Sequence, residues 1–211
     1  MMRGKFITFE GGEGCGKSTQ VKRLKAELEK LGIETYLTRE PGGTWLAEQI
    51  RTLIKDQATE APVDRTELLL FLAARAQLVE KEILPALKAG KWVISDRFSD
   101  STLAYQGYGR GLNLDFIREA NDFACSSLRP DLTFFLKVSP QVSLERRLGR
   151  EAAQLSIADR IEKAGDDFHA RLMRGFEELA ANEPERIKTV NADQSIDMVW
   201  EEIWKYLKPF S

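Results

Sequence analysis

Short apolar runs and longer amphipathic segments alternate along this chain. The runs are rich in β-branched and aromatic residues, and glycine, proline or polar residues bound them, as is typical of buried strands. Between the runs, apolar positions recur at spacings of three and four, as is typical of helices that bury one face. The pattern predicts strands over residues 5–10, 33–38, 92–96, 132–138 and 187–190. It predicts helices over residues 17–31, 44–55, 64–89, 113–127, 139–150, 166–182 and 195–208.

The alternation of strands and helices predicts an α/β fold. Because the strands are apolar almost throughout, they are expected to form a parallel sheet covered by helices on both faces. No repeat, low-complexity segment or Pro/Gly-rich linker divides the 211 residues, so a single domain spanning residues 1–211 is predicted. Ligands of such sheets bind at the carboxyl ends of the strands, which makes the residues that follow each strand the candidates for function.

Several helix ends are marked by capping residues. Gly32 follows the first predicted helix as expected of a residue just beyond a helix C-terminus. Ser139 can cap the helix over 139–150 with Pro140 in its first turn, and Ser195 can cap the last helix.

The helix over 64–89 is unusual because residues 68–74, Leu-Leu-Leu-Phe-Leu-Ala-Ala, are apolar on every side. A helix of this kind is buried on several faces. Its outer face is expected to meet a second copy of the chain or a ligand. The alternative is a central core helix within one subunit.

Residues 11–18, Gly-Gly-Glu-Gly-Cys-Gly-Lys-Ser, match the G-x-x-x-x-G-K-[ST] phosphate loop, and they lie between a predicted strand and a predicted helix, as that loop requires. Backbone N–H groups of the loop can converge on phosphate oxygens, and the helix N-terminus adds partial positive charge. Lys17 supplies a charge for the β- and γ-phosphates, and the Ser18 hydroxyl can ligate Mg²⁺. The residues expected to bind a nucleoside triphosphate are Gly11, Gly12, Glu13, Gly14, Cys15, Gly16, Lys17, Ser18 and Thr19.

Two further strand ends carry polar residues. Asp96 ends the strand over 92–96, where an acid can hold Mg²⁺ opposite Ser18; the alternative is a simple capping role. Arg97 is suited to bidentate contact with a phosphate. The alternative is that it forms a simple ion pair with Asp96. After the second strand, the turn over 38–44 is expected to place Arg39 and Glu40 at the ligand edge, although a plain connector explains its glycines equally well.

Glu13 is out of place in a phosphate loop, where a carboxylate is electrostatically unfavourable. Either it is a solvated bystander, or it accepts a hydrogen bond from a sugar hydroxyl of a second ligand. Arginines between residues 144 and 162 can close over a triphosphate, although charged helix faces are usually only solvated. These arginines are Arg146, Arg147, Arg150 and Arg160.

Composition narrows the possible functions. A net charge of −2 and a pI near 5.7 argue against nucleic acid as a partner. Cys15 and Cys125 have no metal-binding spacing, and Cys15 is expected to be a small filler rather than a reactive thiol. No signal sequence or long apolar span is evident, which predicts a cytoplasmic protein without a membrane segment.

The chain contains a single histidine, His169, so acid–base chemistry by histidine is not expected. An acceptor that is itself a phosphate monoester would need no general base, because its oxygen is already anionic near neutral pH. Catalysis would then consist of positioning and charge neutralisation.

Taken together, several motifs resemble those of the thymidylate kinase family over essentially the whole chain. Besides the phosphate loop, which continues from Phe9-Glu10, they are Thr38–Thr44, Phe71–Arg75, Asp96–Phe98, Ala104–Gly107 and Asp159–Glu162. The resemblance implies a P-loop fold with a five-stranded parallel sheet in the order 2-3-1-4-5. It also implies Mg²⁺-dependent transfer of the ATP γ-phosphoryl group to the 5′-phosphate of dTMP, and a homodimer packed through helices that include residues 64–89.

The resemblance also implies roles for individual residues. Phe71 resembles the aromatic residue that stacks on thymine, Arg75 the arginine that donates to the base, and Thr102 a polar contact to the base edge. Tyr105 resembles the tyrosine that crowds a 2′-hydroxyl. Arg51 and Arg97 resemble the arginines that hold the acceptor phosphate, and Glu13 the acid that meets its 3′-hydroxyl. Glu40 is placed among the substrate-binding residues, and a cis Glu40–Pro41 bond is expected by analogy.

The lid predicted around residues 147–163 resembles the kind that supplies a catalytic arginine, because the phosphate loop has Cys15 where other members have one. Arg160 is the predicted lid arginine, acting in catalysis with Lys17 and Arg97, while Arg147 and Arg150 both fit a second role. Two rivals are a deoxynucleoside kinase with Glu40 as general base, and a P-loop ATPase or GTPase. The latter is disfavoured because no Asn-Lys-x-Asp segment is present.

Overall fold

A computed structural model of the chain describes residues 3–56, 60–152 and 165–208. It contains a five-stranded parallel sheet in the order β2-β3-β1-β4-β5, which confirms the predicted fold and strand order. The strands are β1 (Phe6–Glu10), β2 (Thr35–Arg39), β3 (Trp92–Asp96), β4 (Leu132–Lys137) and β5 (Ile187–Asn191). Each lies within about two residues of its prediction.

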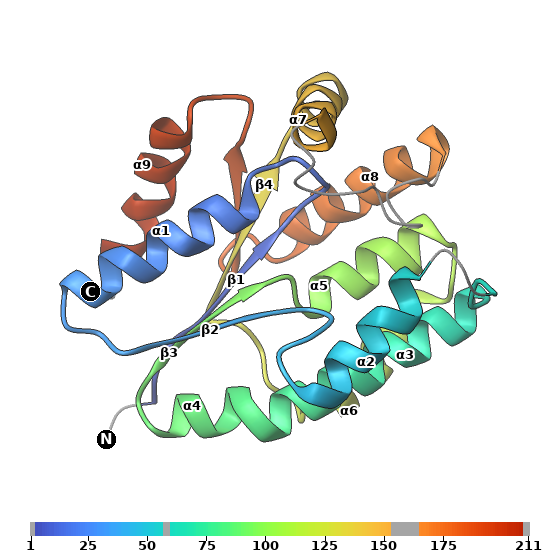
Figure 1. Ribbon diagram of the computed structural model, residues 1–211, viewed down its shortest axis with the longest axis horizontal. Helices are drawn as coiled ribbons and strands as arrows, with labels where there is room; N and C mark the ends of the chain where they lie inside the picture. Colours follow the sequence, from blue (N-terminus) through green and yellow to red (C-terminus); the bar gives the residue numbers. More distant parts are fainter. Residues whose placement is uncertain (1–2, 57–59, 153–164, 209–211) are drawn as a thin grey trace.

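Helices cover both faces of the sheet (Figure 1). The α-helices are α1 (Lys17–Lys30), α2 (Trp45–Lys55), α3 (Asp64–Leu78), α4 (Leu84–Lys88), α5 (Ser99–Thr102), α6 (Leu114–Ala124), α7 (Pro140–Ala152), α8 (Asp166–Asn182) and α9 (Ile196–Leu207). Side chains of α1 and α9 pack with Ile7, Phe9 and Phe134 in the core on one face. The other face carries α3, α4, α6 and α8, whose cores include Phe6 and Phe135.

The predicted caps are present. Ser195 accepts a hydrogen bond from the Met198 N–H, and Ser139 accepts one from the Val142 N–H. Gly32 has a φ of 74°, which lets the chain leave α1, and the Ile33 N–H returns to the Leu28 carbonyl. These ends fix where α1, α7 and α9 stand relative to the sheet.

Two helical segments differ from the prediction. The helix expected over 64–89 is divided into α3, a π-helical turn at Val79–Ile83 and α4. Pro85 has no N–H and its ring would clash with the carbonyl four residues earlier in a regular helix, so the wider turn before it relieves the clash. The helical stretch formed by α5 and the π-helical segment Leu103–Gly109 was not predicted, because its Ser, Gly and Asp content favours turns.

The register of the parallel strands places the carboxyl ends of β1, β2 and β3 at the same level. Phe9 of β1 and Arg39 of β2 are both paired with Asp96 of β3. The phosphate loop, the turn after β2 and the turn after β3 therefore leave the sheet at one edge, and this edge carries the candidate site.

Candidate active site

The phosphate loop wraps around the N-terminus of α1 as predicted. Gly14 and Gly16 have φ angles of 73° and 92°, which residues with a side chain rarely adopt. A Cβ at Gly14 would also lie 2.8 Å from the Ser143 carbonyl oxygen. The Ser143 hydroxyl donates to the Glu13 carbonyl at 2.7 Å, so α7 holds the loop from outside.

Lys17 points back into this loop. Its Nζ donates to the Gly12 carbonyl at 2.8 Å and to the Gly11 carbonyl at 3.2 Å. Burial and nearby Arg97 lower the pKa of Lys17, but Cys15, Glu13 and Asp96 raise it, and the net direction is upward. The ammonium is therefore charged at neutral pH and is aimed at the space that the loop encloses.

Ser18 and Asp96 meet at the mouth of the loop, where the Ser18 hydroxyl donates to Asp96 Oδ2 at 2.8 Å. Asp96 therefore faces the loop serine rather than serving only as a cap. A hydroxyl and a carboxylate are hard oxygen ligands of the kind that Mg²⁺ binds together with phosphate oxygens. Within the described ranges, no group of three His, Cys, Asp or Glu side chains forms a separate metal site.

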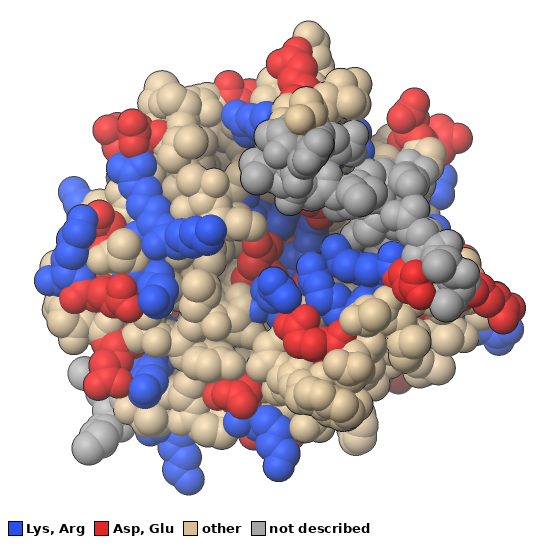
Figure 2. All heavy atoms as spheres, viewed as in Figure 1, with Lys and Arg blue, Asp and Glu red and all other residues tan. Residues whose placement is uncertain are grey.

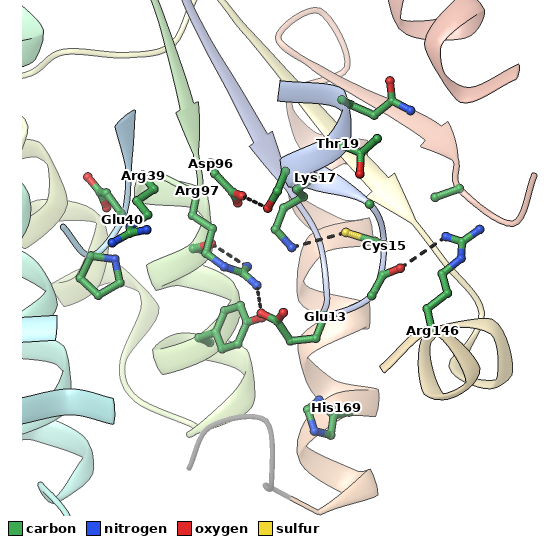
Figure 3. Close-up of a pocket in the computed structure, with 18 of the residues that line it drawn as sticks. Glu13, Cys15, Lys17, Thr19, Arg39, Glu40, Asp96, Arg97, Arg146 and His169 are labelled. Atoms are coloured by element: carbon green, nitrogen blue, oxygen red, sulfur yellow. Dashed lines mark hydrogen bonds and ion pairs between the residues drawn. The ribbon is translucent and has the colours of Figure 1, made fainter. Parts of the chain in front are cut away.

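Arg97 occupies the centre of the site (Figure 3). Its guanidinium donates to Glu13 Oε1 at 2.5 Å and to the Gly11 carbonyl at 2.9 Å, and it lies 4.9 Å from the centre of the Tyr105 ring. The ion pair that Arg97 forms is thus with Glu13, not with Asp96 as the alternative had it. Burial lowers the pKa of Arg97, but Tyr105, Glu13 and Asp96 raise it well above its usual value.

The partner of Arg97 in this pair, Glu13, is not a solvated bystander. Burial alone would raise the pKa of Glu13, but the cations Lys17 and Arg97 lower it far below its usual range. Glu13 therefore carries a full negative charge that partly neutralises two cations of the site.

Arg75 lies beneath this centre and is only 1% exposed. Its guanidinium binds one oxygen of Glu40 through two nitrogens, at 2.8 and 2.5 Å. It also donates to Thr102 Oγ1 at 2.7 Å, to Asn121 Oδ1 at 2.6 Å and to the Phe98 carbonyl at 3.1 Å. All five guanidinium N–H groups are thus engaged within the protein, so donation to a bound base requires one of these contacts to be exchanged.

The turn after β2 brings Glu40 into this cluster. The Glu40–Pro41 bond is cis, which confirms the expectation by analogy. Thr44 caps α2 by accepting from the Ala47 N–H, and Arg51 donates to the Pro41 carbonyl at 2.8 Å. Arg39 forms an exposed ion pair with Glu48. The end of β2, the turn and α2 therefore bring two arginines and a buried acid to one side of the site.

A single pocket of about 760 Å³ connects the phosphate loop with these residues. Figure 2 shows basic and acidic side chains gathered around a hollow near the centre of this face. The predicted residues that line the pocket are Glu13, Gly14, Cys15, Gly16, Lys17, Ser18, Thr19, Arg39, Glu40, Arg51, Phe71, Asp96, Arg97, Thr102, Tyr105 and Arg146. Arg75, Gly11 and Gly12 lie behind the lining. Arg160, much of the predicted lid and the side chain of Arg150 lie outside the described residues.

Sequence reasoning missed other lining residues. Gln194 and Ile196 follow β5 and line the pocket beside the phosphate loop; the rule that ligands bind at the carboxyl ends of strands gave a signal for them. Arg146, one of the four arginines named as candidates in the sequence, does contact the loop, donating to the Gly14 carbonyl at 3.3 Å. Gln106 also lines the pocket, and no spacing in the sequence distinguished it.

No helix in the described part of the chain has the length and apolar character needed to cross a membrane.

Comparison with known proteins identifies one family. A family model described as thymidylate kinase matches residues 9–203. The thymidylate kinase of Nostoc punctiforme is 45% identical over 208 residues, covering 98% of this chain and 97% of that protein. That of Synechococcus sp. (strain JA-3-3Ab) is 48% identical over 205 residues, covering 97% and 95%. A crystal structure of thymidylate kinase from Ehrlichia chaffeensis is 35% identical, with a TM-score of 0.79 and coverage of 98% and 99%.

Proposed function

The chain belongs to the thymidylate kinase family, and we propose that the pocket at the carboxyl edge of its sheet is where the family's reaction takes place. The reaction transfers the γ-phosphoryl group of ATP to the 5′-phosphate of dTMP, giving dTDP and ADP. The strongest support for this assignment is the position of Arg97. It lies between the phosphate loop and the Phe71 side of one continuous pocket, and so between a donor and an acceptor bound end to end.

At the donor end, Lys17 and the backbone N–H groups of the loop hold the triphosphate. Arg146 and the residues after β5 line the same end. Ser18 and Asp96 would hold Mg²⁺, which when bound neutralises charge on the phosphates and aligns them.

At the acceptor end, Phe71 stacks on thymine, and Thr102 and Arg75 contact the base edge. Tyr105 faces the sugar and disfavours a 2′-hydroxyl. Arg51 and Arg97 hold the 5′-phosphate. Glu13 and Glu40 complete the substrate side, with Glu13 near the 3′-hydroxyl and Glu40 fixing Arg75.

The transfer needs no proton removal. An acceptor phosphate oxygen, already anionic, forms the new bond to the γ-phosphorus while the bond from that phosphorus to the β–γ bridging oxygen breaks, and the electron pair leaves with ADP. Cations cancel the repulsion between the two anions. The rival in which Glu40 deprotonates a nucleoside hydroxyl is disfavoured, because the Glu40 carboxylate is buried and bound by Arg75.

We treat residues 1–211 as one kinase domain in which the lid around 147–163 closes over the donor. Arg160 stays a predicted catalytic residue of that lid. A cytoplasmic location and the absence of a nucleic-acid partner likewise stay predictions, which the net charge of −2 favours.

Replacing Arg97 by alanine is expected to lower kcat/KM for dTMP by about 10- to 100-fold, the value of a charge-assisted hydrogen bond of about 1.5–3 kcal/mol. The KM for ATP should change less, because Lys17 and the loop remain. Steady-state assays with dTMP, dUMP and the ribose analogue of dTMP measure this effect and the selectivity together. Arg129→Ala, at an exposed ion pair of 3.8 Å, is the matched control. Unchanged dTMP kinetics in the Arg97 variant would remove Arg97 from the proposed site.

We also propose that the chain forms a homodimer through α3 and its neighbours. α3 packs against α2 and α6, and the outward sides of these three helices expose large apolar side chains. These include Leu46, Leu53, Leu69, Phe116 and Phe123, each at least 43% exposed. Large apolar side chains exposed on packed neighbouring helices favour an interface at this surface, and a two-fold axis would bring the same surface of both copies together.

Leu69→Arg is expected to weaken this dimer by about 100-fold or more. In a two-fold interface the substitution occurs twice, once in each copy. If each buried charge costs about 1.4 kcal/mol, each raises the dissociation constant about tenfold, and together they raise it about 100-fold. Light scattering after size exclusion over a dilution series gives the dissociation constant. Met198→Arg, at an equally exposed apolar residue of α9, should leave the dimer intact. Equal effects of the two substitutions would place the interface elsewhere.

A further inference from the structure

Glu10, the last residue of β1, has no role in the site described above, although it is fully buried. One carboxylate oxygen accepts from the Phe98 N–H at 2.8 Å and from the Ser101 N–H at 3.3 Å. The other accepts from the Ser101 hydroxyl at 2.5 Å. Glu10 does not line the pocket, so these contacts hold the turn that follows β3 from behind.

The same turn carries Arg97 in an unfavourable conformation. Arg97 has a φ of 74°, in the left-handed region that side-chain-bearing residues avoid. Hydrogen bonds hold the backbone around it: the Arg97 N–H donates to the Phe9 carbonyl at 2.9 Å, and the Ser95 hydroxyl donates to the Arg97 carbonyl at 2.6 Å. The next backbone N–H in the chain, that of Phe98, donates its hydrogen bond to Glu10. Glu10 therefore helps to maintain the backbone geometry that aims Arg97 into the pocket.

Glu10 also reaches the side chain of Arg97 through Ser101. The Arg97 guanidinium donates to Ser101 Oγ at 3.3 Å, while the single Ser101 hydroxyl hydrogen is directed to Glu10. A hydroxyl that donates to a carboxylate keeps its lone pairs free for another donor. The ionised carboxylate of Glu10 thus orients Ser101 so that it can accept from Arg97.

We propose that Glu10 is a positioning residue for phosphoryl transfer, which fixes Arg97 through the Phe98 N–H and the Ser101 hydroxyl. The inference rests on the proposed role of Arg97 in the acceptor site. It assigns a function to a buried acid that never contacts the substrate.

The charges around Glu10 make this positioning dependent on pH. Burial and the charge of Asp100 raise the pKa of Glu10, while Arg97 and the hydrogen bonds from Ser101 and Phe98 lower it, and the net effect is a pKa of about 7. Arg75 also faces Glu10, and Asp100 is itself bound by Arg186 at 2.7 and 2.8 Å. A proton on the oxygen that faces Ser101 would turn the Ser101 hydrogen toward Arg97 and remove an acceptor from it. Activity should therefore decline as the pH falls below about 7.

The test is the pH profile of kcat/KM for dTMP in Glu10→Gln. An amide that faces Ser101 imitates the protonated acid at every pH. Above pH 8, kcat/KM for dTMP in this variant should therefore be about tenfold lower than in the wild type, which corresponds to the loss of one hydrogen bond to a charged group. The acceptor phosphate has its own second pKa near 6. The acid limb should therefore fall from a slope of about two protons to about one, while the KM for ATP stays within about twofold.

Two further variants separate positioning from stability. Asp100→Asn removes a charge that raises the pKa of Glu10, so its acid limb should move to lower pH with the plateau retained. Ser101→Ala removes the relay, so the double variant with Glu10→Gln should be no worse, within about twofold, than Glu10→Gln alone. If Glu10→Gln does not fold, the Asp100→Asn profile decides, and an unmoved acid limb overturns the proposal.

Arg97→Ala, measured in the same assays, separates this inference from the proposed function. Loss of dTMP efficiency in Arg97→Ala together with an unaltered profile in Glu10→Gln would refute the positioning role and leave the site assignment intact. Unaltered dTMP kinetics in Arg97→Ala would instead refute the assignment of Arg97. A lowered melting temperature in Glu10→Gln with the wild-type slope would make Glu10 merely structural.

Discussion

Replacing Lys17 by alanine is expected to lower kcat by about 10²- to 10³-fold. The variant loses a preorganised charge where negative charge develops, a loss of about 2.7–4 kcal/mol for a group of this kind. The Lys17 ammonium is buried, charged, and held at the Gly12 carbonyl at 2.8 Å. Nothing else in the described loop carries a side-chain cation. The measurement is single-turnover conversion of dTMP to dTDP at saturating ATP, which excludes product release.

Controls for this variant separate charge from geometry. Lys17→Arg keeps a charge but places a planar guanidinium where the loop holds a compact ammonium, so it should recover little activity. Lys22→Ala, at an exposed lysine of α1, should leave kcat unchanged within about twofold. A Lys17→Ala variant that keeps more than about a tenth of wild-type kcat would contradict the donor-side assignment.

Hydrophobic patterning predicted the sheet well because its signal is local. Each strand is a short apolar run ended by turn residues, and helices α1 and α9 carry their caps in the adjoining sequence. The segment over residues 99–109 carries no such signal. Its helical form depends on contacts with α8: Gly109 packs closely on Phe168, and Gly175 packs closely on Tyr108. Propensity alone could not predict a helix that distant packing stabilises.

The same division applies to the site. The phosphate loop and Asp96 could be predicted because each lies at the end of a strand, and the strand and the residues that follow it are adjacent in the sequence. The partners of Arg75 and Glu10 were not, because Asn121 lies 46 residues from Arg75 and Ser101 lies 91 residues from Glu10. Only the fold brings these groups together. Sequence reasoning therefore identified the charged groups of the site but not what orients them.

The buried pair of Arg75 and Glu40 supports the second large prediction. Arg75→Met is expected to lower the free energy of unfolding by about 3–5 kcal/mol, because it leaves the Glu40 carboxylate buried without its cation. Replacing both residues, as in Arg75→Met with Glu40→Gln, should recover part of the loss. Denaturant unfolding monitored by fluorescence gives these values, and Arg65→Met, at an exposed position of α3, is the control.

The stability deficit of Arg75→Met should depend on pH in a defined direction. Burial raises the pKa of Glu40 above its usual range, and Arg75 lowers it part of the way back, so the pKa should rise further once Arg75 is removed. A group whose pKa is higher in the folded state binds more protons there, and its contribution is lost as the pH rises through that pKa. The deficit should therefore be smaller near pH 5 than near pH 8. A deficit that grows on acidification would show that the Glu40 carboxylate is not left as an uncompensated buried charge.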